Sequence, residues 1–463
     1  MFEDTTIAAI ATAYGESGIG VIRLSGPKSL AITERLFVPA AKKEGKDFSF
    51  KPRYMHFGFI ADPKTQKPVD EALCVYMKGP HSYTGEDCVE IQCHGSMLSL
   101  QAILALCYQE GAEPADRGEF TKRAFMNGRL DLAQAEAVMD VIKAASEKGF
   151  GSAVSQLFGS LSERVRAIRS ELLEVLVALT VEMDYPDEDI EETTLEKLSE
   201  GLAPIRKSLD DLLAGAREGR IIREGLNLVI VGKPNVGKSS LMNDFLKENR
   251  SIVTEIPGTT RDTIEEQASI RGIKVRLTDT AGIHESDDLV ESLGIERSKE
   301  AFDKADLLLL LLDGSRPLSK EDLELLKMAQ NRQTLVIINK QDLPQCFAEE
   351  EIGALDPEFR ICKAALKEGE GLEAIADAIE DFVYGSGMRR TEDAVLSNLR
   401  HIRLAEQARD SLASAVNMIA MGEAMDFIEI DIRAAFDLLG EITGDTASDE
   451  IIKTVFERFC LGK

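Results

Sequence analysis

The sequence predicts a multidomain α/β protein in which a domain with a doubly wound sheet is inserted into a discontinuous helical bundle domain. Residues 1 to about 122 mix short β-type runs, such as IAAIATAY and CVEIQCHG, with turns marked by Gly and Pro, which indicates an N-terminal α+β domain. From about Arg123, and again after Val383, the apolar residues follow a helical period. Between the two helical parts lie apolar, β-branched runs. A length of 463 residues suits about three domains.

One-sided apolar stripes predict the helical parts. A long helix is indicated by the stripe of Leu161, Val165, Ile168, Leu172, Val175, Leu179 and Met183. The acidic run Asp184 to Glu192, broken at Pro186, predicts a solvated loop, and a further helix is expected over residues 194–220. After Val383, SNLRHIRLAEQARDSL and DFIEIDIRAAFDLLGEI are the clearest amphipathic runs. We therefore expect domains at residues 1–122, 123–222, 223–382 and 383–463, in which the second and fourth are halves of one bundle.

Composition excludes several classes of protein. The chain is 44% hydrophobic and 29% charged, and no apolar run approaches the ~20 residues of a membrane helix. The start MFEDTT is not a secretory signal, and seven cysteines without a Cys-x-x-Cys spacing predict a reduced, cytoplasmic protein. The histidines are scattered and indicate no zinc site. A net charge of −27 argues against long nucleic-acid contacts by this chain alone, so any nucleic acid is expected to be held mainly by a partner.

The string GKPNVGKS, from Gly232 to Ser239, predicts a phosphate-binding loop. It follows the strand-like run LNLVIV and precedes SLMNDFL, which resembles the opening of a helix. Glycines let backbone N–H groups converge on phosphate, Lys238 is placed to reach the β- and γ-phosphates, and Ser239 offers a hydroxyl to Mg²⁺. A Gly-rich structural turn is the alternative for this string alone. The string DTAG, from Asp279 to Gly282, favours the phosphate loop because its strand KVRLTD ends in an acid suited to hold Mg²⁺ through water.

The string NKQD, from Asn339 to Asp342, predicts that the base is guanine. It follows the strand LVIIN, and the Asp342 carboxylate can accept from both N–H donors of guanine, where adenine would leave it unpaired. The fifth element of such sites, usually Ser-Ala-Lys, stands here as Ala364-Ala365-Leu366, which keeps only a backbone contact to the base. Together the strings predict a Ras-like P-loop GTPase domain that binds GTP and Mg²⁺.

The sequence lacks the residues that usually orient the attacking water and stabilise the charge of the transition state in small GTPases. Ile283 follows DTAG, where many small GTPases have the Gln that orients water, so Glu291 in the acidic run HESDDLVES is the candidate, with Glu285 and Asp287 next. Asn235 could hold a monovalent cation against the phosphates in place of an arginine finger. The run TEIPGTTRD would be the first switch, with Thr260 as second Mg²⁺ ligand, or a purely structural turn.

Three further strings resemble the tRNA-modification GTPase family MnmE, also called TrmE: SYTGEDCVEIQCHG, GEFTKRAFMNGRLDLAQAEAV and the terminal FCLGK. The resemblance runs from IAAIAT to the last residue. It implies a homodimer joined through N-terminal domains that bind a formyl- or methylene-tetrahydrofolate. It also implies a partner, the FAD- and NADH-using MnmG (GidA), with which these proteins place an aminomethyl or carboxymethylaminomethyl group on carbon five of the wobble uridine of certain tRNAs.

The resemblance also assigns residues. Folate contacts fall on Arg23, Glu90, Arg129 and Lys463, where Arg129 replaces a usual Lys and changes the donor geometry. From the residues alone, a salt bridge at the end of a strand is the alternative for Arg23, and Glu90 could equally face solvent. Cys460 could be a thiolate nucleophile on the uridine or a small buried residue. Potassium maps to Asn235, Thr254, Ile256 and Thr259, and Mg²⁺ to Ser239 and Thr260.

The complete set of predicted nucleotide and ion contacts is Asn235, Val236, Gly237, Lys238, Ser239, Ser240, Thr254, Glu255, Ile256, Pro257, Gly258, Thr259, Thr260, Asp279, Thr280, Ala281, Gly282, Asn339, Lys340, Asp342, Ala364, Ala365 and Leu366. A regulatory or ribosome-assembly GTPase of the Era-like kind is the competing class, since it shares the phosphate loop and NKxD. That class does not account for the N-terminal strings or Cys460, and it normally carries a basic RNA-binding module.

Overall fold

The structure is a computed structural model that describes residues 5–40, 48–184, 195–248, 265–279, 302, 305–385 and 396–463. The chain forms two compact units. The first comprises Met1–Met139, Gln156–Leu202 and Asp410–Lys463, and the second comprises Asp140–Ser155 and Ala203–Arg409. The division into four sequence segments at residues 122, 222 and 382 stays a prediction.

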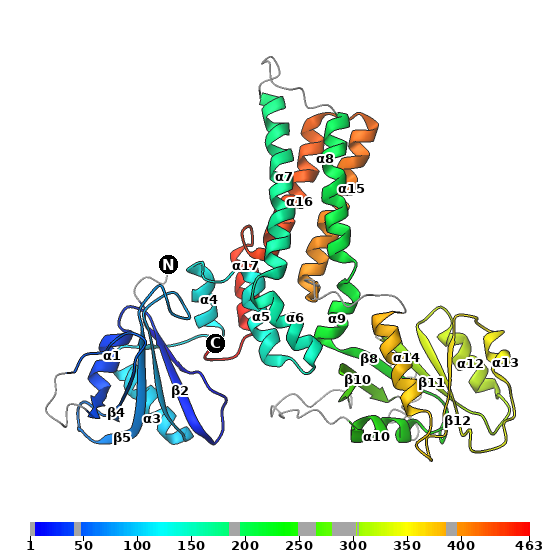
Figure 1. Cartoon of the computed structure of the whole chain (residues 1–463), viewed down its shortest axis with the longest axis horizontal. Helices are drawn as coiled ribbons and strands as arrows, with labels where there is room; N and C mark the ends of the chain where they lie inside the picture. The colour runs from blue at the N-terminus through cyan, green and yellow to red at the C-terminus, as the bar shows by residue number, and fades with distance from the viewer. Residues whose placement is uncertain are drawn as a thin grey trace, which may run out of the picture. The chain divides into compact units, whose positions relative to one another are not determined.

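The first unit contains a seven-stranded sheet in the order β3-β4-β5-β6-β2-β1-β7 (Figure 1). Its strands are β1 (Ile7–Ile10), β2 (Ser17–Ser25), β3 (Phe37–Pro39), β4 (Met55–Ala61), β5 (Pro68–Met77), β6 (Cys88–Gly95) and β7 (Glu113–Pro114). All neighbours are antiparallel except β1 and β7. The helices α1 (Ser29–Leu36) and α3 (Met97–Gln109) pack on one face. The predicted α+β character of this region is confirmed.

Strand alternation decides which side chains of this sheet can form a site. On β6, Val89, Ile91 and Cys93 are buried in the core beneath α1 and α3, so Glu90 and its alternate neighbours lie on the other face. That second face is partly covered by a small apolar cluster that includes Ile7, Ala9 and Phe120, with Tyr83 packed against it. Glu90 is therefore presented beside an aromatic patch.

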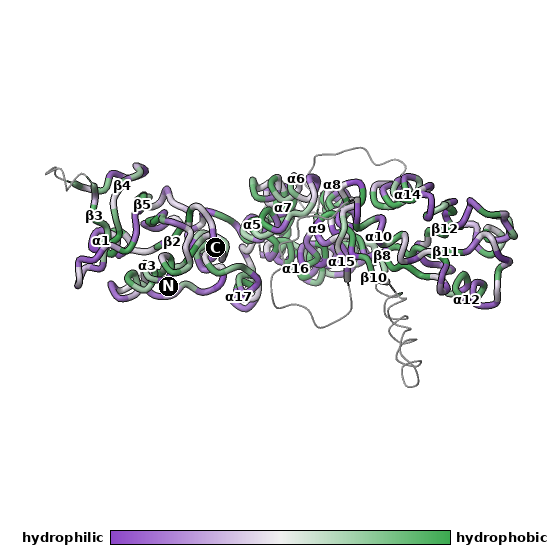
Figure 2. The backbone as a smooth tube through the Cα atoms, turned by 90° about the horizontal axis from the view of Figure 1, so that it is seen from below, coloured by the Kyte–Doolittle hydropathy of each residue, from purple (hydrophilic) through white to green (hydrophobic). Residues whose placement is uncertain are grey.

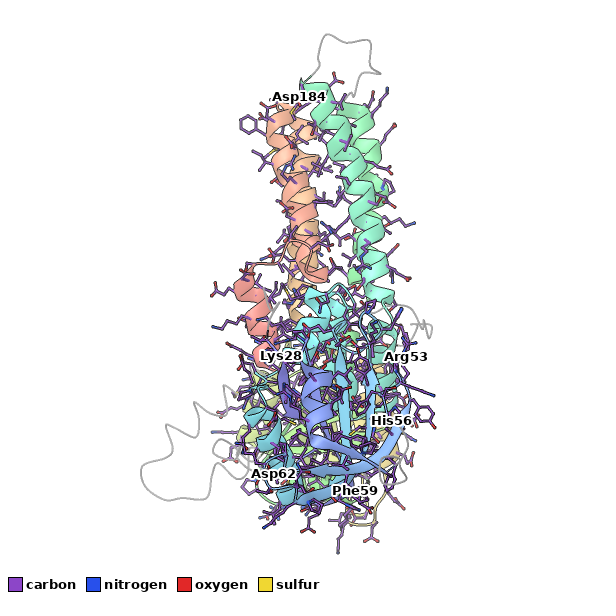
Figure 3. All side chains as sticks on the ribbon, turned by 90° about the vertical axis from the view of Figure 1, so that its left-hand side faces the viewer. Lys28, Arg53, His56, Phe59, Asp62 and Asp184 are labelled. Atoms are coloured by element: carbon purple, nitrogen blue, oxygen red, sulfur yellow. The ribbon has the colours of Figure 1, made fainter. Side chains whose placement is uncertain are left out.

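Helices make up the rest of the first unit. They include α4 (Glu119–Met126), α5 (Leu132–Lys143), α7 (Ser160–Asp184), α16 (Met425–Thr443) and α17 (Asp449–Glu457). Most of the predicted stripe on α7 is confirmed, since Leu161, Val165, Ile168, Leu172 and Leu179 are all buried. The predicted Val175 and Met183 are only partly buried, and Leu176 is buried instead of its neighbour Val175. Asp184, labelled in Figure 3, is the last residue of α7. α7 packs along α16, and α5 packs against Phe456 of α17 and against Phe459, two residues after the end of α17.

Arg169 fixes the contact between α7 and α16. Its guanidinium lies 4.3 Å from the ring centroid of Phe436 and donates from Nε to the Phe436 carbonyl at 3.2 Å. It also forms an ion pair with Asp445, in the turn between α16 and α17. Because α17 leads directly to FCLGK, this contact helps to place the C-terminus.

The single helix expected over residues 194–220 was wrong. The structure has two helices, α8 (Leu195–Leu213) and α9 (Ala216–Glu224), separated at Ala214 and Gly215. Gly215 caps α9 with φ −93° and ψ 4°, and glycine is a poor helix former because it loses more backbone freedom than other residues. The helix α15 (Leu399–Met421) confirms the predicted amphipathic run after Val383.

The second unit contains a six-stranded sheet in the order β13-β12-β11-β8-β10-β9. Its strands are β8 (Leu226–Val231), β9 (Glu265–Ile270), β10 (Ile273–Asp279), β11 (Leu307–Asp313), β12 (Thr334–Asn339) and β13 (Arg360–Lys363). All pairs are parallel except β9 with β10. β11 and β12 are buried along their length and appear green in Figure 2.

Helices cover both faces of this sheet. Residues of α9, α10 (Lys238–Glu248) and α14 (Leu372–Tyr384) share one apolar cluster with the sheet, while α12 (Lys320–Ala329) and α13 (Glu349–Gly353) contribute to a cluster on the other face. The strand order reverses between β8 and β11, which is where nucleotides bind in doubly wound sheets. The predicted doubly wound P-loop domain is confirmed.

Candidate functional site

The phosphate loop connects β8 to α10 and is shaped by two glycines. Gly232 has φ 152°, and a Cβ there would lie 2.6 Å from the Leu311 carbonyl oxygen. Gly237 has φ 112°, and a Cβ there would lie 2.3 Å from Asn339 Nδ2. Both positions need glycine because the backbone is left-handed and its neighbours are too close for a side chain.

Lys238 is folded onto the loop that carries it. Its Nζ donates to the carbonyls of Gly232 at 2.6 Å and Lys233 at 2.8 Å. Asn235 is exposed and left-handed, with φ 64°, and Ser239 and Ser240 are exposed at the start of α10. Backbone N–H groups at a helix N-terminus together with a lysine form an anion site, so this loop can cradle phosphates.

Asn339 ties the phosphate loop to the fifth element. It is 4% exposed; its Nδ2 donates to the Val236 carbonyl at 2.7 Å, and its Oδ1 accepts from the Leu366 N–H at 3.1 Å. Ala364, Ala365 and Leu366 are buried. The structure therefore brings together three predicted contact segments that are far apart in sequence.

Lys340 and Asp342 follow at the carboxyl end of β12. Lys340 has φ 66°, and its Nζ lies 2.6 Å from Asp313 Oδ2 at the end of β11. Asp342 is exposed beside them. A carboxylate open to solvent at this edge of the sheet is free to accept from a purine base.

Several predicted contacts lie outside the described residues: Thr254, Glu255, Ile256, Pro257, Gly258, Thr259, Thr260, Thr280, Ala281, Gly282 and Glu291, together with the predicted acidic loop beyond Asp184. Asp279 is the last residue of β10. Among the described residues, no three His, Cys, Asp or Glu side chains are grouped so that they could hold a metal ion.

A second cluster lies in the first unit. Arg23 on β2 and Glu90 on β6 face each other in the sheet register and form an ion pair, with Nη2 2.8 Å from Oε1. The salt bridge weighed for Arg23 is thus present, and Glu90 is only 20% exposed rather than turned to solvent. Lys463 lies near both: burial lowers its pKa and Arg23 lowers it further, while Glu90 and Cys460 act in the opposite direction.

Tyr83 joins this cluster and was missed by the sequence analysis. The Arg23 guanidinium lies 4.8 Å, and that of Arg129 5.0 Å, from the centroid of the Tyr83 ring. Tyr83 Oη lies 2.9 Å from Thr121 Oγ1. The only sequence feature that could have identified Tyr83 as a site residue is its position within the string SYTGED. Two guanidiniums on one ring, with Glu90 and Lys463 nearby, suit a planar ligand that carries negative charge.

The C-terminal residues reach this cluster by packing on the N-terminal sheet. Gly462 has φ 87°, and a Cβ there would lie 2.2 Å from the Ile10 carbonyl oxygen. The Cys460 carbonyl accepts from the Gly118 N–H at 3.3 Å. Cys460 is exposed and not disulfide-bonded, which contradicts the alternative that it is a small buried residue.

No helix in the described part of the chain is long and apolar enough to cross a membrane.

A family model described as the MnmE helical domain matches residues 132–460, and one described as the GTP-binding protein TrmE N-terminus matches residues 6–129. The chain is 49% identical to the tRNA modification GTPase MnmE of Alkaliphilus metalliredigens and 46% identical to that of Clostridioides difficile, each over 100% of both chains.

Solved structures with detectable likeness include Era of Aquifex aeolicus, bound to GDP and AlF₄⁻, at 25% identity and a TM-score of 0.27, over 40% of this chain and 66% of that chain. The G domain of the T. maritima FeoB iron transporter has 23% identity and a TM-score of 0.26, over 34% of this chain and 98% of that chain. The chain belongs to the MnmE (TrmE) family of tRNA modification GTPases.

Proposed function

We propose that this chain is a potassium-dependent GTPase that acts with a MnmG-type FAD partner on the wobble uridine of certain tRNAs. It adds an aminomethyl or carboxymethylaminomethyl group to carbon five, using a tetrahydrofolate one-carbon unit and GTP hydrolysis. The proposal rests on one cluster built from both ends of the chain: Arg23 and Arg129 lie over the Tyr83 ring, and Glu90 and Lys463 lie beside Arg23.

The chemistry of this cluster supports a folate. Its cationic side chains suit the carboxylates of the folate tail, Glu90 suits the donor edge of the pterin, and the Tyr83 ring suits a planar heterocycle. Arg23 Nη1 is buried and has no hydrogen-bond partner in the part of the chain that the structure describes. A buried donor without a partner is costly, and a bound ligand would satisfy it.

Gly462→Ala tests the folate site without touching any proposed ligand contact. The added Cβ would meet the Ile10 carbonyl and force the last turn, with Lys463, away from Arg23. We expect affinity for 5-formyl-tetrahydrofolate, measured by calorimetry on the full chain, to fall about tenfold, the effect of losing one charged hydrogen bond. Gly422→Ala is the matched control because Gly422 is also left-handed, at φ 73°, but has open space around it. Unchanged folate affinity in Gly462→Ala would remove Lys463 from the site.

GTP and Mg²⁺ are proposed for the second unit. The loop from Gly232 to Ser239 would hold the phosphates, and Ser239 would offer its exposed hydroxyl to Mg²⁺ with Thr260 as the second protein ligand. Asp279 would act on Mg²⁺ through water, and Asp342 would select guanine. Bound Mg²⁺ would neutralise phosphate charge as it develops during hydrolysis.

Glu291 is proposed to orient the attacking water because Ile283 has no polar group with which to do so. We expect Glu291→Ala to slow steady-state hydrolysis and to leave GTP binding unchanged. If turnover is unaffected, the role passes to Glu285 or Asp287.

The open face of the N-terminal sheet supports the proposed homodimer. Ile19 on β2, Met55 and Phe57 on β4, and Leu73 on β5 are 62%, 46%, 50% and 37% exposed. By strand alternation, Met55, Phe57 and Leu73 share the face that presents Glu90, while Ile19 lies where the register of β2 with β6 shifts. Exposed apolar patches of this kind mark interaction sites. Light scattering of the intact chain should give twice its 50.8 kDa mass, and a monomeric mass would contradict the dimer.

The remaining elements of the proposal follow from the family. The net charge of −27 fits a tRNA substrate held mostly by the MnmG-type partner. Action on tRNA and free cysteines fit a cytoplasmic protein. We propose that Cys460, exposed at the end of the helical domain, is a nucleophile toward the uridine, and that GTP-driven movement of residues 223–382 is transmitted to it through the bundle.

A further inference from the structure

We propose that Asp313, at the carboxyl end of β11, is a positioning residue for guanine recognition that acts through the ammonium group of Lys340. Neither the predicted strings nor the family match assigns a role to Asp313. The inference depends on GTP binding alone and is independent of potassium and folate.

Both carboxylate oxygens of Asp313 are engaged. Oδ2 accepts from Lys340 Nζ at 2.6 Å, and Oδ1 accepts from the Ser315 backbone N–H at 3.0 Å and from its hydroxyl at 2.6 Å. The Asp313 side chain is 9% exposed and that of Lys340 is 28% exposed. A carboxylate fixed in this way gives the lysine one defined direction.

That direction places the lysine at the ligand edge of the sheet. β11 and β12 are parallel and pair Asp313 with Asn339, so Lys340 leaves β12 beside the end of β11. Its four-carbon stem must then cross the carboxyl edge between the two strands to reach Asp313. Ligands of doubly wound sheets bind outside this edge, and Asp342 stands on the same loop. The stem therefore supplies an apolar surface for a purine ring.

Other contacts hold the loop backbone. The Gly314 N–H donates to the Asn339 carbonyl at 2.9 Å, the Gln341 N–H to the Ala364 carbonyl at 3.1 Å, and Gln345 Nε2 to the Lys340 carbonyl at 2.9 Å. Removing the charge of Asp313 therefore leaves the path of the loop in place. The loss of this charge frees only the Lys340 side chain to leave its position.

The Asp313–Lys340 pair persists across neutral pH. Burial raises the pKa of Asp313, but hydrogen bonds from Lys340 and Ser315 outweigh it and hold the pKa below its ordinary value. A carboxyl group with a lowered pKa stays ionised until the pH falls below the range of ordinary aspartates. The ion pair is thus present at neutral pH.

A double-mutant cycle on the full chain tests the inference. GDP affinity is measured by calorimetry for Asp313→Asn, Lys340→Met and the double variant. We expect each single change to weaken binding about tenfold, the effect of losing a charge-assisted contact. If Asp313 acts through Lys340, the double variant binds GDP as Lys340→Met does. The proposal would be overturned if the double variant lost GDP affinity by the product of the two single losses, or if Asp313→Asn kept the native GDP affinity.

Two further variants separate positioning from folding. Asp306→Asn removes another carboxylate next to β11, one that accepts from Arg220 and the Asn227 N–H far from the base loop, and it should leave GDP affinity unchanged. If Asp313→Asn does not fold, Ser315→Ala is the milder test. It should weaken GDP binding about threefold in the native background and not at all beside Lys340→Met. Equal losses in both backgrounds would reject the inference, whereas a native chain that does not bind GDP would reject the nucleotide site itself.

Discussion

Asn339→Ala should weaken GDP binding by about a hundredfold. The side chain is 4% exposed and joins the Val236 carbonyl to the Leu366 N–H. Alanine leaves both backbone groups buried without a partner, and each costs about 1–3 kcal/mol. A loss of about 3 kcal/mol corresponds to roughly a hundredfold in affinity. Calorimetry with GDP on the purified full-length variant measures it.

Gln330→Ala is the control for Asn339→Ala. The Gln330 side chain donates a single hydrogen bond to the Leu355 carbonyl at 2.8 Å, in the same unit but away from the nucleotide loops. Its removal should alter thermal stability slightly and GDP affinity not at all. If Asn339→Ala keeps its GDP affinity within about threefold of the native value, the bridge between the loops does not organise the site.

Hydrolysis should require potassium, and Asn235→Ala should lower turnover in potassium by about a hundredfold while GTP still binds. Asn235 is exposed on the phosphate loop, where its amide oxygen can coordinate a weakly hydrated cation beside the phosphates. A cation held at this place would stabilise the negative charge of the transition state, as an arginine finger does in other GTPases. Loss of one such group lowers turnover by about 10²- to 10³-fold. Phosphate release in potassium and in sodium salts measures the effect.

Asn331→Ala is matched to Asn235→Ala in backbone geometry. Asn331 is exposed and left-handed at φ 58°, like Asn235 at φ 64°, but lies between α12 and β12. Both changes place alanine in a strained backbone conformation. If GTP turnover falls in Asn235→Ala and not in Asn331→Ala, the loss therefore comes from a specific role of the Asn235 side chain. Equal turnover of the native chain in the two salts would show that no potassium ion takes part.

The sequence predicted the GTPase fold well because its signals are local. The strand-like runs LNLVIV and LVIIN form the buried strands β8 and β12, and glycines at Gly232 and Gly237 marked a tight phosphate loop. The apolar stripe of α7 was equally clear. The break between α8 and α9 at Gly215 was not predicted. The apolar residues keep a helical period on both sides of this glycine, so the sequence indicated one continuous helix.

Contacts between distant residues could not be predicted. The bridge from Asn339 to Leu366 and the pair of Asp313 with Lys340 depend on which strands are neighbours in the sheet. Tyr83 carries no chemical signature in sequence, and only the folded sheet brings it between Arg23 and Arg129. The family resemblance supplied Arg23 and Glu90 as contacts, but their ion pair comes from the register of β2 with β6.

We propose that the chain couples GTP hydrolysis in its second unit to folate-dependent uridine modification in its first. Modification of tRNA in the presence of a MnmG-type partner, a tetrahydrofolate one-carbon donor, GTP and potassium tests it most directly. We expect Asn235→Ala, which still binds GTP, to lose nearly all of the modified uridine. Gly462→Ala, which still hydrolyses GTP, should form about tenfold less of it when the folate concentration is below the native dissociation constant. Asn331→Ala and Gly422→Ala should form it at the native level. Full modification by Asn235→Ala would show that hydrolysis and uridine chemistry are independent.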